Sequence, residues 1–223
     1  MTVPARRATQ VADWRRFDPI ELSPILTGAL AAFRDGGYHG TTVRDIAGRV
    51  GVTVPALYYH HQSKQGVFLA LLDVAMDDLI PRVHAAVSAG GDRPEQQFAN
   101  LIEAVALHMT ERSDLASLDS ELRYLDSRSR AHYATRRRKV QRLLIDILGA
   151  GVAEGVFDVS HVADTARALL GMQQSIATWY RPRKGGLPPR DIAERYVTLS
   201  LNAVRAAPDV QPKGTKVRRK TGA

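Results

Sequence analysis

The sequence contains no cysteine, and this absence excludes several kinds of functional site. A chain without thiols forms no disulfide framework and offers no thiolate as a metal ligand or as a nucleophile. No apolar run approaches the roughly 18 residues needed to cross a membrane, and the first ten residues lack the apolar core of a signal peptide. The sequence therefore predicts a cytoplasmic protein with no membrane partner.

The basic residues exceed the acidic ones, and the excess lies at the two ends of the chain. The net charge is +8, with eight basic and five acidic residues in 1–64, seventeen of each in 65–204, and six against one in 205–223. Basic termini on a neutral body favour a polyanionic partner such as double-stranded DNA. For the tail alone, solubilising charge on a disordered segment is an equally good interpretation.

Apolar residues recur at helical spacing along the whole chain, which predicts an all-α protein. The first helix is expected to start near residue 22 and to end at Gly36-Gly37, and Ser63 is expected to cap a long helix that ends near Pro81 or a little beyond. Other helices are expected at about 43–50, 54–61, 98–109, 114–125, 130–154, 160–180 and 190–206. The polar segment after Pro208 is expected to be disordered.

Residues 43–61 carry the spacing of a helix-turn-helix. Ala47 lies where two short helices must approach, Gly51 lies where the turn requires a left-handed backbone, and Leu57 is the inward anchor of the second helix. At about 100° per residue, Val54 and His61 point inward with Leu57.

The opposite face of this second helix carries aromatic and small side chains but no carboxylate. It consists of Pro55, Ala56 and Tyr59, flanked by Tyr58 and His60. Hydroxyl and imidazole groups can donate to phosphates and to base acceptors in the major groove. Simple packing of the two tyrosines against the next helix is the alternative. A metal site is not expected, because adjacent histidines diverge on a helix and no carboxylate completes a ligand set.

The stretch Thr41-Thr42-Val43-Arg44-Asp45-Ile46-Ala47, followed by Gly51-Val52 and by Leu57-Tyr58-Tyr59-His60-His61-Gln62-Ser63-Lys64, resembles the DNA-binding domain of the TetR family of transcriptional regulators. The resemblance covers residues 20 to about 72. It implies a homodimeric repressor with two recognition helices in successive major grooves. The expected organisation is a basic arm at 1–19, a helix-turn-helix domain at 20–66, a helical ligand-binding and dimerisation domain at 67–207, and a basic tail at 208–223.

The same resemblance implies a set of DNA contacts. Thr42, Tyr59 and Lys64 are expected on phosphates, and the arm, with Arg6, Arg7, Arg15 and Arg16, on the DNA backbone or in the minor groove. The full expected set on the domain is Thr42, Arg44, Thr53, Val54, Pro55, Ala56, Tyr58, Tyr59, His60 and Lys64. The sequence departs from the family at His61, where phenylalanine is usual, at Pro55, which replaces a polar residue, and at Gly66, which cannot complete a capping box with Ser63.

The second half contains no catalytic motif, so an enzyme is not expected and no cofactor is expected. Gly151-Val152-Ala153-Glu154-Gly155-Val156-Phe157 and Trp179-Tyr180-Arg181-Pro182 are similar to TetR-family regulators of fatty-acid and sterol catabolism, several of which respond to acyl-CoA thioesters. That similarity implies a small-molecule effector with an apolar part in the bundle and phosphates on arginines. The expected ligand residues are His108, Met109, Leu122, Tyr124, Leu125, Tyr133, Arg137, Arg138, Met172, Gln173, Ile176 and Trp179, for each of which ordinary core packing is an alternative.

The last two helices are expected to form the dimer interface as a four-helix bundle. The apolar face expected to self-associate consists of Ala166, Leu169, Leu170, Ile192, Tyr196, Leu199 and Ala203. The sequence therefore favours a ligand-released repressor. An activator or ligand-independent regulator with the same heads, or a carrier that uses the helical pocket, remains open.

Overall fold

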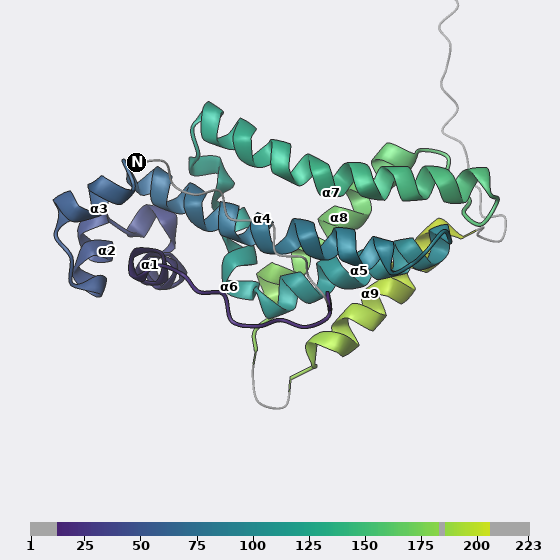
Figure 1. Ribbon diagram of the computed structural model, residues 1–223, viewed down its shortest axis with the longest axis horizontal. Coiled ribbons are helices and arrows are strands. Elements are labelled where there is room, and N and C mark those ends of the chain that lie inside the picture. The colour runs from purple at the N-terminus through teal and green to yellow at the C-terminus, as the bar shows by residue number, and fades with distance from the viewer. Residues whose placement is uncertain (1–12, 183–185, 206–223) are drawn as a thin grey trace, which may run out of the picture.

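The computed structural model describes residues 13–182 and 186–205, and all regular elements within those ranges are helices (Figure 1). The expected arm residues Arg6 and Arg7 and the tail from 208 lie outside the described residues. The elements are α1 (Pro24–Gly40), α2 (Val43–Val50), α3 (Val54–His60), α4 (Lys64–Ser88), α5 (Pro94–Glu111), α6 (Ser113–Ala116), the 3-10 helix η1 (Ser117–Tyr124), α7 (Ser127–Ala153), α8 (Val162–Trp179) and α9 (Pro189–Val204). The predicted all-α class is confirmed.

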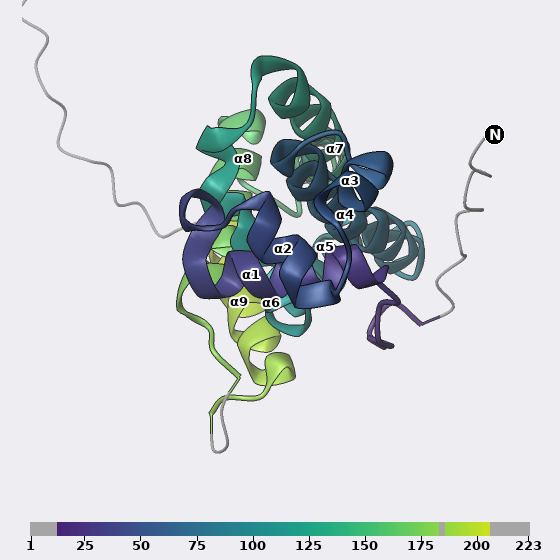
Figure 2. The same cartoon turned by 90° about the vertical axis from the view of Figure 1, so that its left-hand side faces the viewer.

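Helices α1, α2 and α3 form a small head at one end of the molecule, and Figure 2 looks onto that head. Thr42 and Asp45 form a capping box at the start of α2, and Gly51 ends α2 in the left-handed region with φ 69°. Ala47 and Leu57 are buried between the helices, as the helix-turn-helix spacing predicts. Gly37, with φ 66°, interrupts α1 at the predicted glycine pair, although a short helical turn continues to Gly40.

Helix α4 joins the head to the body and is longer than predicted. Ser63 caps it through the backbone N–H of Gly66, and it runs through Pro81 to Ser88. A proline inside a helix removes one hydrogen bond and normally ends or kinks the helix. Here Leu79, Val83 and Ala86 are buried around that point, and the extensive contact between α4 and α5 holds the helix together.

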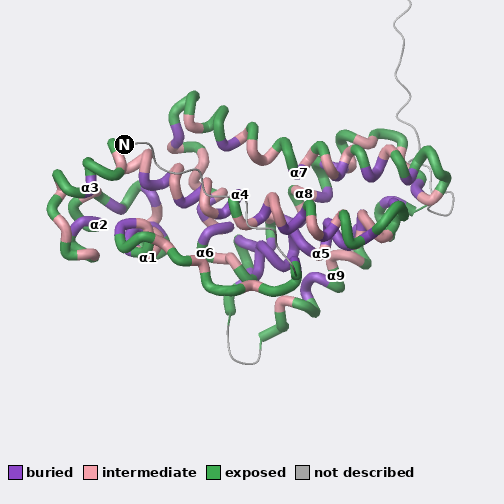
Figure 3. Tube along the Cα trace, viewed as in Figure 1, coloured by how far each residue is buried: buried purple, intermediate pink, exposed green. Residues whose placement is uncertain are grey.

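The body is a bundle in which α5 lies at the centre, in contact with α4, α7, α8 and α9. Buried residues concentrate on the facing sides of these helices, whereas the outer side of α7 is exposed (Figure 3). The predicted helix at 114–125 is one α-turn followed by a 3-10 helix rather than a single α-helix.

Residues 13–23 form a segment without helix or strand, here called the strap, that precedes α1. It runs along the body, beneath α5 and α6 in the view of Figure 1, before it reaches the head. Trp14 is 4% exposed, and Ser23 at the other end caps α1 through the backbone N–H of Leu26. The strap is therefore part of the folded body, whereas the sequence predicted a basic arm over residues 1–19.

Candidate DNA-binding surface and ligand pocket

The outward face of α3 is open to solvent over the positions that the sequence predicts for DNA contact. Tyr59 is 88% exposed and Tyr58 is 46% exposed, so neither is packed into the core. Pro55, Ala56 and His60 are exposed beside them, and Val54 is half-buried. Thr53 accepts a hydrogen bond from the backbone N–H of Ala56 and so fixes the start of the helix. No carboxylate belongs to α3, and a phosphate can approach this face without repulsion from its own side chains.

Lys64 is less free than the sequence prediction implies. Its ammonium group donates to the carbonyl oxygens of Tyr38 and Thr41, both at 2.8 Å, and lies 4.2 Å above the Tyr38 ring. Two of its three donors therefore hold the α1–α2 turn, which leaves one donor and the backbone N–H at the start of α4 for a phosphate. The Thr42 hydroxyl likewise donates to Asp45 at 2.7 Å, while Arg44 is exposed.

His61 is not fully buried, although the sequence predicts that it points inward. It ends α3 in an extended conformation and is half-buried. Burial, with His60 beside it, lowers the pKa of His61, so its imidazole favours the neutral form. The predicted inward orientation is thus only partly realised, because the imidazole keeps contact with solvent.

Arg15 belongs to the body rather than to a DNA-binding arm. Its guanidinium donates twice to the Glu103 carboxylate, at 2.6 and 2.7 Å, and lies over the Trp14 ring. Arg16 pairs with Asp18 within the strap. The prediction that both arginines contact DNA is not supported for Arg15, because α5 already holds its charge.

A narrow cavity of about 50 Å³ lies inside the body between α4, α5, α6, η1, α7 and α8. Its wall is mainly apolar. The lining residues are Ala75, Met76, Leu79, Val105, His108, Met109, Leu115, Ala116, Asp119, Tyr133, Arg137, Val140, Leu170 and Gln174.

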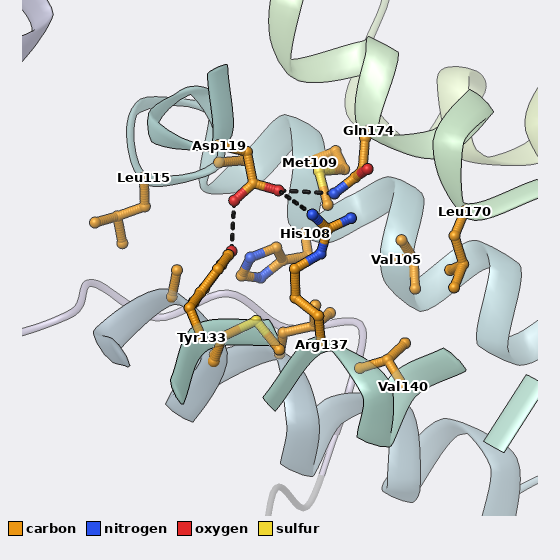
Figure 4. Close-up of a pocket in the computed structure, with 14 residues that line it drawn as sticks. Val105, His108, Met109, Leu115, Asp119, Tyr133, Arg137, Val140, Leu170 and Gln174 are labelled. Carbon is orange, nitrogen blue, oxygen red and sulfur yellow. Dashed lines mark hydrogen bonds and ion pairs between the residues drawn. The ribbon is translucent and has the colours of Figure 1, made fainter. Parts of the chain in front are cut away.

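Three polar side chains of this cavity interact with one carboxylate, that of Asp119 (Figure 4). It accepts hydrogen bonds from the Tyr133 hydroxyl at 2.5 Å and from the Gln174 amide at 2.7 Å, and Arg137 lies 3.8 Å from it. Burial, together with the nearby Asp119 charge, raises the pKa of Tyr133 well above its ordinary value, so the phenol stays protonated and donates. The polar end of the cavity is internally charge-balanced.

An open hollow of about 280 Å³ adjoins the cavity, because Tyr133 and Arg137 line both. Its other residues are Leu122, Arg123, Arg130 and Ala134. Arg130 is oriented by hydrogen bonds to the carbonyl oxygens of Arg123 and Leu125. The hollow thus brings three guanidinium groups to the mouth of an apolar cavity, an arrangement suited to an anion.

The structure brings only part of the predicted ligand set to this site. His108, Met109, Tyr133 and Arg137 line the cavity, and Leu122 lines the hollow. The other predicted residues line neither space. Tyr124 stacks on Tyr38. Three are buried elsewhere, namely Leu125, Gln173 and Ile176, whereas Met172 is half-buried and Arg138 and Trp179 are exposed. The sequence prediction missed Asp119, Gln174 and Arg123.

The predicted dimer face needs a similar correction. Ala166, Leu169 and Ile192 are buried within the protomer's own core, so they are not available to a second copy. Leu170 lines the cavity. Tyr196 is half-buried, and Leu199 and Ala203 are exposed on the outer side of α9. The helical periodicity identified a buried stripe but could not tell an internal face from an external one.

Two further observations concern only residues 13–182 and 186–205. No helix there combines the length and apolar character that crossing a membrane requires. In the same ranges, no three His, Asp or Glu side chains lie close enough together to hold a metal ion.

Comparison with known proteins gives matches over both halves of the chain. A family model described as "Bacterial regulatory proteins, tetR family" matches residues 25–71, and one described as "Tetracyclin repressor-like, C-terminal domain" matches residues 91–204. The HTH-type transcriptional repressor KstR2 of Mycobacterium tuberculosis is 29% identical over 185 residues, which cover 81% of this chain and 90% of KstR2.

Solved structures share the fold. A tetR-family regulatory protein from Rhodococcus RHA1 has a TM-score of 0.75 at 25% identity, over 83% of this chain and 97% of that one. AibR in complex with isovaleryl coenzyme A and operator DNA has a TM-score of 0.70 at 24% identity, over 78% and 95%, a likeness that concerns the fold alone. The curated relatives are DNA-binding regulators and not enzymes. With its helix-turn-helix head and helical body, the chain belongs to the TetR family of bacterial transcriptional regulators.

Proposed function

We propose that the protein is a homodimeric repressor that binds a pseudo-palindromic operator through α3 and is released by an acyl-CoA thioester. The DNA-binding part rests on the outward face of α3, where Tyr58, Tyr59 and His60 are exposed and no carboxylate is present. In a two-fold dimer, two such helices enter successive major grooves about 34 Å apart. Tyr59 contacts the backbone, and Pro55 and Ala56 lie nearest the bases.

The ligand part rests on one observation, the apolar cavity that meets an arginine-lined hollow at Tyr133 and Arg137. An acyl group suits the cavity, and the phosphates of coenzyme A suit Arg123 and Arg130 in the hollow. AibR binds isovaleryl coenzyme A, but its likeness to this chain concerns the fold. The assignment therefore depends on the chemistry of these residues.

The cavity must open to take such a ligand. Ligand sites usually enclose roughly 300–1,000 Å³, whereas this cavity measures about 50 Å³. Occupation therefore displaces wall side chains. That displacement is what allows a ligand to favour a conformation with differently placed heads.

For the dimer, the outer faces of α8 and α9 support self-association. Leu199 is 53% exposed, with Thr198 and Ala203 also exposed on α9 and the small residues Gly171 and Ser175 exposed on α8. Leu199→Asp introduces a charge into this face, so the variant is expected to sediment as a monomer. A dimer of unchanged affinity would move the interface elsewhere.

The test is a salt titration of binding between the purified protein and its own upstream DNA, with and without a long-chain or sterol-derived acyl-CoA. Tyr59→Phe and Lys64→Ala are expected to weaken binding to all sequences, and Lys64→Ala to lower the salt slope by about one. Thermal unfolding is measured in parallel, because Lys64 also holds the α1–α2 turn. Unchanged affinity and slope would reject this docking.

A separate variant tests the proposed ligand site. Arg123→Gln is expected to reduce the release of DNA by the thioester, since this side chain lines the hollow and is 69% exposed. Arg142→Gln, on the exposed face of α7, serves as the control. Equal release from both variants would remove the hollow from the ligand site. Mapping the operator relative to the promoter separates a repressor from an activator.

A further inference from the structure

The strap is held to the body by more than apolar contact. Arg82 donates to the carbonyl oxygens of Trp14 at 3.1 Å and of Arg16 at 2.6 Å, and Arg112 donates to that of Asp18 at 2.5 Å. The Phe17 ring lies 3.7 Å from the guanidinium carbon of Arg82 and 5.1 Å from that of Arg112. Two arginines thus clamp the middle of the strap.

Both arginines are held by one carboxylate. Asp78 accepts two hydrogen bonds from Arg82, at 3.0 and 3.1 Å, and Arg112 lies 3.5 Å from it. Asp78 and Arg82 are one turn apart on α4, and Arg112 follows the end of α5. The position of the Asp78 carboxylate therefore determines where both guanidinium groups sit.

The third partner of Asp78 connects this clamp to the cavity. His108 is 2% exposed, its Nδ1 lies 3.2 Å from Asp78, and its ring lines the cavity wall beside Asp119 and Arg137 (Figure 4). Since Asp78 is paired with arginines and can only accept, Nδ1 of His108 carries the proton. His108 thus contacts the cavity on one side and the clamp on the other.

An occupied cavity requires part of its wall to move, and His108 belongs to that wall. At about 50 Å³ the cavity holds no acyl group without movement of its wall. A buried ring that shifts also moves away from a hydrogen-bond partner fixed on another helix. A displacement of His108 would remove one of the three groups that hold Asp78.

We propose that His108 is a positioning residue that passes occupancy of the cavity to the strap through Asp78, so that ligand undocks the strap and frees the head. This rests on the proposed function, in which a ligand enters that cavity. Only four residues lie between the Asp18 anchor and Ser23, the cap of α1, and the five steps from Asp18 to Ser23 span at most about 18 Å. While docked, the strap restricts the head to positions within that reach.

This coupling between the cavity and the head through the strap is distinct from the connection that α4 makes between body and head. The chain connects the head to the body twice, once through α4 and once through the strap, and α1 also packs against α6 and η1. A hinge motion that α4 permits is limited further while the strap is docked. Undocking removes that limit without breaking any contact within the head. The two states of the element are strap docked and strap released.

The chain offers an internal reporter for these states. It has two tryptophans, Trp14 in the strap, which is 4% exposed, and Trp179, which is 48% exposed. In a Trp179→Phe background, acrylamide quenching of fluorescence reports docking of the strap through Trp14 alone. Quenching is measured on the full chain without ligand and with saturating isovaleryl-CoA or palmitoyl-CoA, and binding of each thioester is followed separately by calorimetry.

Without ligand, His108→Leu is expected to raise Trp14 quenching, because loss of a hydrogen bond to a charged group shifts a docking equilibrium by roughly tenfold or more. His108→Asn retains a donor for Asp78 and is expected to restore docking. The matched control is His132→Leu, which removes a histidine 2.9 Å from Asp73 on the other side of α4, away from the strap. Circular dichroism confirms that each variant is folded. Equal quenching of folded His108→Leu and the parent would overturn the proposal.

With ligand, a bound thioester is expected to raise Trp14 quenching in the parent and to add little in His108→Leu. A thioester that binds by calorimetry but leaves Trp14 quenching unchanged would also overturn the coupling. If no thioester binds, the effector assignment fails, whereas the comparison without ligand still decides whether His108 controls the strap. The two failures are therefore distinguishable.

Discussion

Replacing Asp78 with asparagine tests whether the carboxylate at the centre of the body stabilises the fold. The Asp78 side chain is 13% exposed and faces Arg82, Arg112 and His108. Removing one member of a buried charge network leaves its partners buried without a counter-charge, which costs about 3–5 kcal/mol. Asparagine keeps an acceptor oxygen, so the free energy of unfolding is expected to fall by about 3 kcal/mol, at the lower end of that range.

The assay is urea denaturation of the Asp78→Asn variant and the parent, with the slope of the transition checked for constancy. Asp146→Asn on the exposed face of α7 is the control and is expected to change the free energy of unfolding by less than about 0.5 kcal/mol. A loss below about 1 kcal/mol in Asp78→Asn would refute the argument, since it would mean that water or movement of the arginines replaces the carboxylate.

The pH dependence gives a second check on the same residue. Burial alone would raise the pKa of Asp78, but hydrogen bonds from His108 and Arg82 outweigh it and hold the pKa well below its ordinary value. The stabilisation is then fully present above the unfolded pKa of about 3.9 and is lost as the pH falls through the lower folded value. The gap between parent and variant should stay constant from pH 8 to 5 and narrow only below about pH 4. A gap that closes near neutral pH would contradict the assignment.

Four further substitutions have definite expected outcomes. In Gly151→Ala the new Cβ would lie 2.1 Å from the Phe157 ring, so the free energy of unfolding is expected to fall by about 1–3 kcal/mol. In Gly149→Ala the new Cβ meets no atom within 4 Å, so the free energy of unfolding is expected to rise by about 0.5–1 kcal/mol. The melting temperatures of the two variants should therefore move in opposite directions. Gln173→Met removes a buried amide that has no hydrogen-bond partner among residues 13–182 and 186–205, and urea denaturation should show a gain of about 1 kcal/mol. Thr41→Val removes a buried hydroxyl that donates to carbonyl oxygens of α1, and the same assay should show a loss of about 1–2 kcal/mol.

The head could be predicted from the sequence because its signals are local. Caps such as Thr42 and Ser63, the left-handed Gly51 and the inward Leu57 all lie within about 20 residues and specify one arrangement. The partners of Lys64 were not accessible in this way. They are main-chain carbonyls of an earlier helix and turn, and no side-chain pattern records them.

The pocket could be predicted only in part, because its wall comes from helices far apart in the chain. The sequence selected Gln173 as a polar handle, but its neighbour Gln174 reaches Asp119. Adjacent positions differ by about 100° around a helix, so a small error in the inferred face exchanges one residue for the next. Helical periodicity identifies a buried stripe, but which helix packs against that stripe depends on the tertiary structure.

The sequence of the strap contains aromatic residues that indicate docking, but the count of basic residues alone suggested a DNA-binding arm. Residues 13–18 read as part of a basic arm because of Arg15 and Arg16, yet the same segment contains Trp14 and Phe17. Large aromatic side chains are costly to leave in water, and two within four residues favour a docked segment. Arg15 also has a carboxylate partner on α5 that no local pattern reveals.

The small cavity implies that ligand affinity and conformational response have one origin. A ligand that requires the wall to open binds with an apparent affinity reduced by the fraction of molecules already open. Any contact that holds the wall closed, including the hydrogen bonds of Tyr133 and Gln174 to Asp119, therefore weakens binding and strengthens the response together. A permanently open cavity would bind more tightly but would have no conformational change left to transmit. Under the proposed function, the polar network around Asp119 is therefore part of the control of the head.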